Sequence, residues 1–185
     1  MINKIFKNVD FSKSTLQEED YESCQFINCN FSNINLSHVN FLECEFDNCN
    51  FSLTKVINTA FKSVYFTDCK IIGIDFSEIN PFLLTLNFDN CKLNFSSFYK
   101  LELKGMIFSN CSLEEVDFSE ANLSKAKFSF SDLTNATFDQ TNLEEADFKL
   151  AKNYSIDPEN NRIKHAKFSR DSLVGLLDKY SIHIS

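Results

Sequence analysis

Seven cysteines and three histidines are the residues of this sequence with the greatest chemical potential. Closely spaced thiolates and imidazoles bind zinc, and a thiol beside a histidine can act as a nucleophile. No two cysteines form a CxxC pair, and His38, His165 and His183 are scattered without a cysteine or aspartate at catalytic spacing. The glycine-rich loops that bind phosphates are also missing from the sequence. We therefore predict a protein that is not an enzyme and has no catalytic residues, metal site or cofactor.

The acidic residues are distributed unevenly along the chain. Between Cys111 and Phe148, nine acidic residues stand against two lysines, which gives this stretch a net charge of −7. Such a surface either keeps a flat protein soluble or binds a basic partner. The candidate partner-binding residues are Glu114, Glu115, Glu120, Asp139, Glu144 and Glu145.

The 185 residues together carry a formal net charge of −8. This charge argues against a protein that grips nucleic acid directly, because neutralising phosphates requires clustered lysine and arginine. We see no apolar segment suited to a signal peptide and no run long enough to span a bilayer. We expect a cytoplasmic protein with reduced thiols and no membrane partner.

A repeat of five residues must position all of these side chains. Every fifth residue from Phe6 to Phe76 is apolar or aromatic. The frame then shifts by two residues around Pro81, within residues 77–87, and resumes at Phe88. From Phe88 to Phe148 phenylalanine and leucine alternate at every fifth position. The phenylalanines outside the frame are Phe82, Phe95 and Phe130.

A period of five fits neither an α-helix, with a period of about 3.6, nor a strand, with a period of about 2. It requires a chain that turns a corner every five residues, so that four sides make a square coil of about twenty residues and the coils stack ~4.8 Å apart. We predict one phenylalanine wall from Phe88 to Phe148, an opposite one from Phe98 to Phe138, and two leucine walls. Every cysteine precedes a frame position by two residues. The cysteines are therefore predicted to be small core residues, although stacking would bring Cys24 and Cys44 within reach of a disulfide.

The repeat resembles that of the pentapeptide-repeat family, whose consensus is A(D/N)LXX. Ala121–Asn122–Leu123–Ser124–Lys125 and Ala146–Asp147–Phe148 match this consensus, and the repeat covers roughly residues 4–150. The resemblance implies an all-β fold, a right-handed quadrilateral parallel β-helix with a short C-terminal capping helix. We assign residues 1–168 to the β-helix and residues 169–185 to a capping or dimerisation segment.

Pro81 marks the irregularity in the repeat. Proline cannot donate a hydrogen bond to a neighbouring coil, so the two extra residues belong to a bulge or loop. This segment is either a kinked corner or a small contact loop formed by Asn80, Pro81 and Phe82, with Phe82 pointing outward.

The C-terminal segment has a helical pattern. Ser169 is a suitable N-cap for a helix that runs to about Lys179. Its apolar face and tail consist of Leu173, Leu176, Leu177, Tyr180, Ile182 and Ile184. These residues either only cap the open end of the β-helix or also join two chains. Similarity to the C-terminal module of the quinolone-resistance members of the family implies a homodimer.

The resemblance also implies a function. Members of the quinolone-resistance and microcin B immunity types mimic DNA, and residues 157–163 resemble the corresponding stretch of the immunity type. We predict a DNA-mimicking protein that binds DNA gyrase or topoisomerase IV and protects it from quinolones or a gyrase-directed toxin. The loop at Pro81 is shorter than the loops of the quinolone-resistance members, which favours the immunity type. The alternative is an interaction scaffold for an unknown partner, with no role at a topoisomerase.

Overall fold

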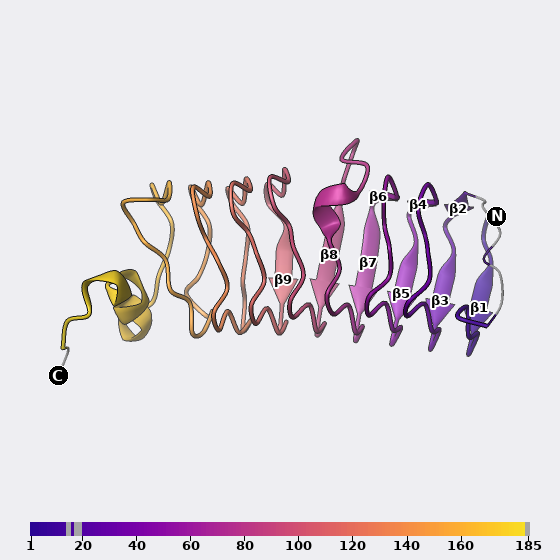
Figure 1. Cartoon of the computed structure of the whole chain (residues 1–185), viewed down its shortest axis with the longest axis horizontal. Coiled ribbons are helices and arrows are strands. Elements are labelled where there is room, and N and C mark those ends of the chain that lie inside the picture. The colour runs from indigo at the N-terminus through magenta and orange to yellow at the C-terminus, as the bar shows by residue number, and fades with distance from the viewer. Residues whose placement is uncertain (14–15, 17–19, 184–185) are drawn as a thin grey trace.

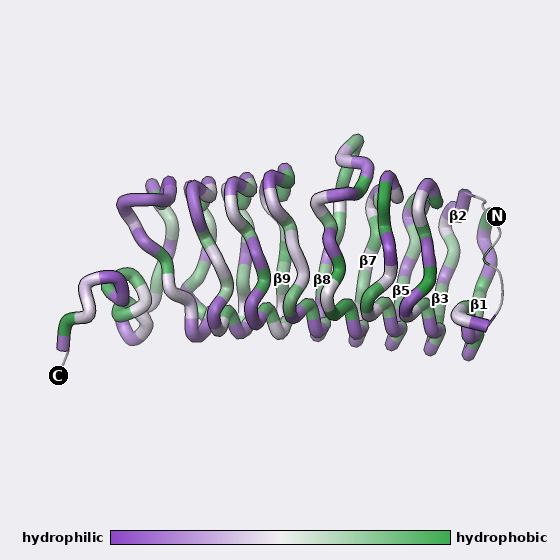
Figure 2. The backbone as a smooth tube through the Cα atoms, viewed as in Figure 1, coloured by the Kyte–Doolittle hydropathy of each residue, from purple (hydrophilic) through white to green (hydrophobic). Residues whose placement is uncertain are grey.

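The chain winds into one long column whose N and C termini lie at opposite ends (Figure 1). The computed structural model describes residues 1–13, 16 and 20–183. Apolar and polar residues alternate at short intervals around every coil of the column (Figure 2). The predicted right-handed quadrilateral parallel β-helix is confirmed.

Two parallel sheets form on different sides of the column. The larger contains β1 (Ile5–Lys7), β3 (Gln25–Ile27), β5 (Glu45–Asp47), β7 (Val64–Thr67), β8 (Leu86–Asp89) and β9 (Ile107–Ser109). The smaller contains β2 (Tyr21–Glu22), β4 (Asn40–Leu42) and β6 (Ala60–Lys62). Beyond β9 the larger sheet continues as single bridges from Ile107 to Lys127, Asp147 and Lys167. We call this whole surface the six-stranded side.

Stacked aromatic rings fill the column. On one wall the ring centroids of Phe108 and Phe128 lie 5.2 Å apart, and those of Phe128 and Phe148 lie 4.7 Å apart, with nearly parallel planes. On the other wall Phe118 stacks on Phe98 at 5.4 Å. Rings of the two walls meet edge to face, an arrangement that aromatic quadrupoles favour. The predicted phenylalanine walls are confirmed.

Most corners of the column use a residue in the left-handed backbone region. Asn28 and Asn48, with φ of 54° and 50°, occupy such positions two residues after a frame position. Asparagine tolerates this conformation better than most residues, which accounts for its abundance here. Phe95 and Phe130 also lie at corners, with φ of 62° and 59°, and are exposed. Two of the three phenylalanines outside the frame are therefore corner residues.

The cysteines are buried, free thiols that belong to the core, as predicted. Cys49 donates its thiol hydrogen to the carbonyl of Phe26 in the preceding coil, with a distance of 3.3 Å from Sγ to oxygen. Thr54 and Thr59 occupy equivalent positions, and their hydroxyls donate in the same way to Phe31 and Leu36. Burial raises the pKa of Cys44 and of Cys111 to about 12. These thiols stay protonated, which suits hydrogen-bond donors of the core.

The two-residue frame shift is also confirmed. Ala60 pairs with Asn80, twenty residues later, whereas Val64 pairs with Leu86, twenty-two residues later. The extra residues follow a 3-10 turn, η1 (Phe76–Glu78), and form a loop that stands out beside β8 (Figure 1). The loop carries Phe82 at an exposed fraction of 65%, and Lys62 Nζ lies 5.2 Å from the centroid of its ring.

The C-terminal segment is helical, but it consists of two 3-10 helices, η2 (Arg170–Leu176) and η3 (Asp178–Tyr180). Ser169 holds the expected N-cap position without forming a side-chain capping hydrogen bond, which corrects our expectation. A short segment that contains Gly175 has little intrinsic stability as an α-helix, so its packing on the last coil decides its geometry. The Gly175 carbonyl accepts a hydrogen bond of 2.8 Å from the Ile156 backbone. The division at residue 168 stays a prediction.

Lys179 ties this segment to the last coil. Its Nζ lies 2.7 Å from Asp157 Oδ1 and 2.6 Å from Glu159 Oε2. These contacts lower the pKa of Asp157 and of Glu159 below their ordinary values and raise the pKa of Lys179. Carboxylates with a lowered pKa stabilise the folded state above their unfolded pKa, and this contribution is lost as the pH falls through the folded value.

We therefore expect Lys179→Met to lower the thermal unfolding midpoint at pH 7 by a few degrees. The difference from the unmodified chain should shrink as the pH falls below about 4, near the unfolded carboxylate pKa. Thermal unfolding followed by circular dichroism from pH 7 to pH 2 measures both effects. A difference that does not change with pH would assign the loss to packing of the lysine stem and contradict the ionic contribution.

Candidate protein-binding face

The acidic residues selected from the sequence do not form one surface. Glu114 lies on one side of the column, and Glu115 lies at the corner that follows it. Glu120 and Asp139 lie together at the next corner, where the Glu120 backbone amide donates to the Asp139 carbonyl. Glu144 and Glu145 lie five residues further, on the next side of the coil. The six residues therefore cover three of the four sides of the column.

Most of these carboxylates interact with the preceding or following coil. Glu120 accepts a hydrogen bond of 2.8 Å from the Tyr99 hydroxyl and pairs with Lys100 at 3.2 Å. Both contacts lower the pKa of Glu120, and the Tyr99 hydroxyl has the larger effect. The other ionic contacts are Glu144 with Arg162 at 3.1 Å and Glu145 with Lys125 at 3.6 Å. Asn94 donates to Glu114 at 2.9 Å, and Asn160 donates to Asp139. Their assignment as a partner-binding set stays a prediction.

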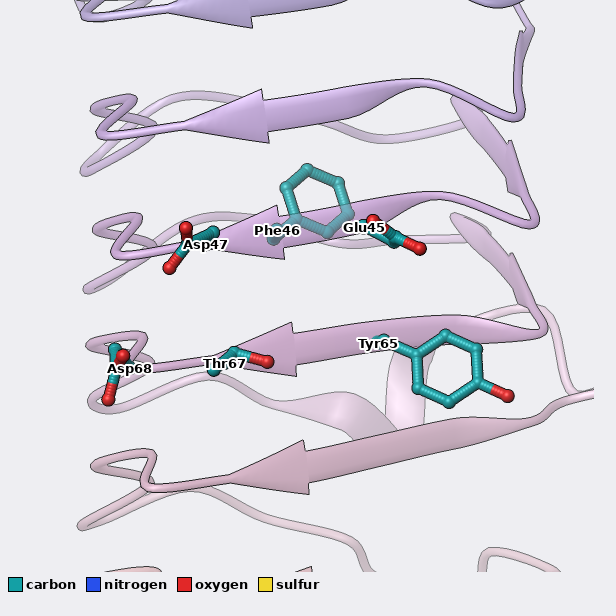
Figure 3. Close-up of a pocket in the computed structure, with 6 residues that line it drawn as sticks. All are labelled: Glu45, Phe46, Asp47, Tyr65, Thr67 and Asp68. Carbon is teal, nitrogen blue, oxygen red and sulfur yellow. The ribbon is translucent and has the colours of Figure 1, made fainter.

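A different set of carboxylates shares one flat surface. Glu45 and Asp47 flank the buried Phe46 on β5, and Asp89 ends β8 two coils later. Asp68 occupies the corner that follows β7, with φ of 55°, and lines the same hollow as Glu45 and Asp47. Strand alternation explains this placement, because Phe46 points into the core and its two neighbours must point outward. Figure 3 shows Glu45, Asp47 and Asp68 at this surface with Tyr65 and Thr67. We call Glu45, Asp47, Asp68 and Asp89 the acidic face.

The acidic face is shallow and carries an aromatic residue. Glu45, Asp47, Tyr65, Thr67 and Asp68 line one hollow, which adjoins a second one lined by Asn87, Asp89 and Ile107 among others. Tyr65 follows Glu45 on the next coil and is 52% exposed. This arrangement can accept hydrogen bonds from lysine or arginine side chains and stack against an arginine.

The four carboxylates of the acidic face are not neutralised by basic side chains. Gln25 donates to Glu45 at 3.0 Å and Asn110 donates to Asp89 at 3.0 Å, so both contacts come from neutral amides. Asp68 likewise accepts from the amide of Asn90. No salt bridge to these four residues forms within the part of the chain that the structure describes. Basic side chains of a ligand could therefore pair with them.

We missed the acidic face in the sequence because the four residues are dispersed between positions 45 and 89. The signal that identifies them is the repeat itself. Writing the sequence in rows of twenty residues, with twenty-two in the row that contains Pro81, places Glu45 above Tyr65 and Asn87, and Asp47 above Thr67 and Asp89. A search for local charge density finds residues 111–148 instead, where successive acidic residues point to different sides.

The other predicted contact residues are accessible to different degrees. Asn80 accepts a hydrogen bond of 3.0 Å from the Phe82 backbone, and Pro81 and Phe82 are exposed in the loop. At the C-terminal end Leu173, Tyr180 and Ile182 are exposed, whereas Leu176 and Leu177 are half-buried. Ile184 lies outside the described residues. Val174, which we did not select, is also exposed.

Membrane-spanning and metal-binding features are absent from the described residues. No helix there is long and apolar enough to cross a membrane. Over the same residues, no group of three or more His, Cys, Asp or Glu side chains is arranged to hold a metal ion.

Comparisons with known proteins agree on the architecture. A family model described as pentapeptide repeat region matches residues 19–87 and 79–148. A trypsin-treated form of QnrB1, a plasmid-mediated fluoroquinolone resistance protein, is 20% identical, and the match covers 100% of this chain and 99% of that chain with a TM-score of 0.53.

A second solved structure is HetL, a pentapeptide repeat protein involved in heterocyst differentiation regulation from the cyanobacterium Nostoc sp. strain PCC 7120. It is 16% identical, and the match covers 91% of this chain and 86% of that chain with a TM-score of 0.63. No curated protein sequence matches this chain at a significant level. At these identities the two structures show a shared fold.

Proposed function

Since the chain belongs to the pentapeptide-repeat family, we propose that it is a cytoplasmic binding protein whose acidic face engages a basic protein surface in place of DNA. DNA gyrase and topoisomerase IV are the leading candidate partners, because these enzymes bind duplex DNA on basic surfaces. Binding would protect the enzyme from quinolones or from a gyrase-directed toxin. The protein has no catalytic step in this proposal.

The observation that carries the proposal is the density, on the acidic face, of carboxylates that form no salt bridge with the described residues. The acidic face places four carboxylates on three successive coils. At ~4.8 Å per coil these three levels span about 10 Å. One strand of B-DNA spaces its phosphates by ~3.4 Å, so the local charge density resembles that of one DNA strand. Tyr65 adds a surface on which an arginine of the partner can stack.

Two further regions support binding to a large partner. The loop residues Asn80, Pro81 and Phe82 precede β8 and would offer an apolar contact, since Pro81 and Phe82 are exposed. The exposed residues Leu173, Tyr180 and Ile182 at the C-terminal end, together with Leu176, Leu177 and Ile184, would join two chains into a homodimer and lengthen the column. The choice of a topoisomerase rests on the similarity of fold to QnrB1, a fluoroquinolone resistance protein.

A supercoiling assay with purified gyrase, with and without ciprofloxacin, tests the proposal. We expect the unmodified protein to inhibit or to protect gyrase at micromolar concentration. The combined variant Glu45→Gln, Asp47→Asn, Asp68→Asn and Asp89→Asn should weaken this effect at least tenfold, because losing four charge contacts removes most of the attraction.

The matched control removes four carboxylates from other sides of the column, in the combined variant Glu114→Gln, Glu115→Gln, Glu144→Gln and Glu145→Gln. It changes the net charge equally and compares the acidic face with residues that the sequence pattern selects. Retention of most of the activity would favour the acidic face, and its loss would favour Glu114, Glu115, Glu144 and Glu145. If the control loses as much as the first variant, the acidic face is the wrong site. If the unmodified protein has no effect on gyrase with or without the drug, the topoisomerase hypothesis is wrong and the alternative, a scaffold for another protein, is favoured.

A further inference from the structure

The six-stranded side carries positive charge at its C-terminal end. Lys127, Lys149 and Lys167 project from the coils that follow β9, and Arg170 begins η2 just after the last of them. All four are exposed. Lys149 pairs with Asp147 at 3.6 Å, whereas Lys127, Lys167 and Arg170 form no salt bridge with the described residues. We call these four residues the basic end.

Ile107 lies midway between the two charged regions. Residues that pair from coil to coil form a row on this side, and Ile107 follows Glu45, Tyr65 and Asn87 as the fourth residue of one such row. The same row continues from Ile107 through Lys127 and Asp147 to Lys167. Ile107 is apolar, yet it lies on the outer surface of the sheet and is 38% exposed. Glu45 therefore lies three coils before Ile107, and Lys167 lies three coils after it.

We propose that the six-stranded side binds a second copy of this chain, face to face and with the two columns antiparallel. A two-fold axis that runs along β9 through Ile107 reverses the column direction and keeps the strand direction. Each position then faces the position equally far on the other side of Ile107. The contact is isologous, as in most symmetric dimers.

Charge complementarity identifies a second copy as the occupant. Glu45 faces Lys167 of the second copy, and Asn87 faces Lys127 of the second copy. Tyr65 faces Asp147 of the second copy, which can accept a hydrogen bond from the tyrosine hydroxyl. The two Ile107 side chains meet at the axis, where they exclude water. No position in this row opposes a like charge. If the two molecules were parallel, with the two-fold axis along this row, Glu45 would face Glu45 and Lys167 would face Lys167.

This contact is expected to be weak and sensitive to salt. Seven coil levels at ~4.8 Å spacing form a strip about 30 Å long and only one short strand wide. Such a strip buries less than the ~800 Å² per partner of a standard stable interface. Attraction between exposed charges is screened over a Debye length of about 8 Å at physiological ionic strength. The dimer would therefore form at high protein concentration and cover the acidic face until a stronger partner displaces it.

Sedimentation equilibrium at 20 mM and at 500 mM NaCl tests the contact. We expect the average molar mass of the full chain at 20 mM NaCl to be twice that measured at 500 mM NaCl, and the change to be reversible. Association through the apolar C-terminal residues would persist at high salt, so the two kinds of contact separate. Glu45→Lys alone and Lys167→Glu alone should each weaken the low-salt association more than tenfold, because each places like charges opposite one another.

The decisive experiment mixes the Glu45→Lys chain with the Lys167→Glu chain. In the mixed dimer, each substituted position faces the substituted position of the other chain, and the two charges there are opposite. The unmodified Lys167 of the first chain likewise faces the unmodified Glu45 of the second, so the mixture should recover the association that neither variant shows alone.

Three outcomes would each overturn the proposal: a mixture that stays dissociated, single variants that associate like the unmodified chain, or no low-salt association at all. Circular dichroism checks that both exposed substitutions leave the fold intact.

The same variants separate this inference from the proposed function, whose acidic face it shares. Lys167→Glu leaves Glu45, Asp47, Asp68 and Asp89 unchanged, so it should lose self-association and keep any effect on gyrase. An effect on gyrase without self-association would overturn only the dimer. Self-association without an effect on gyrase would overturn only the topoisomerase hypothesis.

Discussion

Replacement of Phe128 by alanine is expected to lower the free energy of unfolding by about 3–5 kcal/mol. The Phe128 ring is fully buried and stacks between Phe108 and Phe148 at 5.2 and 4.7 Å. Its edge contacts with Phe118 and Phe138 join the two walls. Alanine would leave a cavity that the backbone cannot close, because inter-coil hydrogen bonds fix the spacing above and below it. Chemical denaturation followed by circular dichroism measures the change.

Phe130→Ala is the matched control, because it removes the same ring two residues away. Phe130 is 57% exposed at a corner with φ of 59°. We expect a change within about 0.5 kcal/mol, which is usual for surface substitutions. Equal effects of the two substitutions would contradict the assignment of inward and corner positions. A small effect of Phe128→Ala would mean that the column tolerates cavities by local rearrangement.

The repeat alone predicts most of the column, because its physical constraints are periodic. A coil that buries a frame residue and the residue two positions before it on each side leaves a single consistent register. The sequence therefore predicts Phe128 in the core and the pairing of residues twenty apart, and it locates the shift near Pro81. The buried cysteines follow from the same pattern.

The candidate site was harder to predict because binding depends on which side a residue faces. Glu114 and Glu115 are neighbours in the sequence of a charged stretch, but the corner after Glu114 separates their directions. Glu45 and Asp89 are 44 residues apart and share one side. The helical segment at the C terminus was predicted in position and not in type, because its geometry depends on contacts with Tyr154 and Ile156 that no local pattern contains.

Replacement of Gly175 by alanine is expected to detach the C-terminal segment from the column. An added Cβ would lie 2.0 Å from the Tyr154 carbonyl oxygen and about 3 Å from its ring, closer than any contact that real Cβ atoms form. The carbonyl belongs to the backbone of the last coil and cannot move without breaking the packing of Ile156. The hydrogen bond from the Ile156 backbone to the Gly175 carbonyl would be lost as well. The buried side chains of Tyr154 and Ile156 would then be exposed to water.

Trypsin digestion measures this detachment, because Arg170 and Lys179 lie within the segment. We expect Gly175→Ala to speed cleavage at these residues at least tenfold and to lower the free energy of unfolding by about 1–3 kcal/mol, as overpacking does.

Gly105→Ala is the control. Gly105 has φ of 73° and nothing within 4 Å of an added Cβ, so alanine there causes only backbone strain of about 1–2 kcal/mol. The control should be destabilised without faster cleavage at Arg170 and Lys179, since its strain lies in the middle of the column. If both variants are cleaved alike, close contact at Gly175 does not hold the segment, and the exposed residues Leu173, Tyr180 and Ile182 lose the rigid support that a homodimer would require.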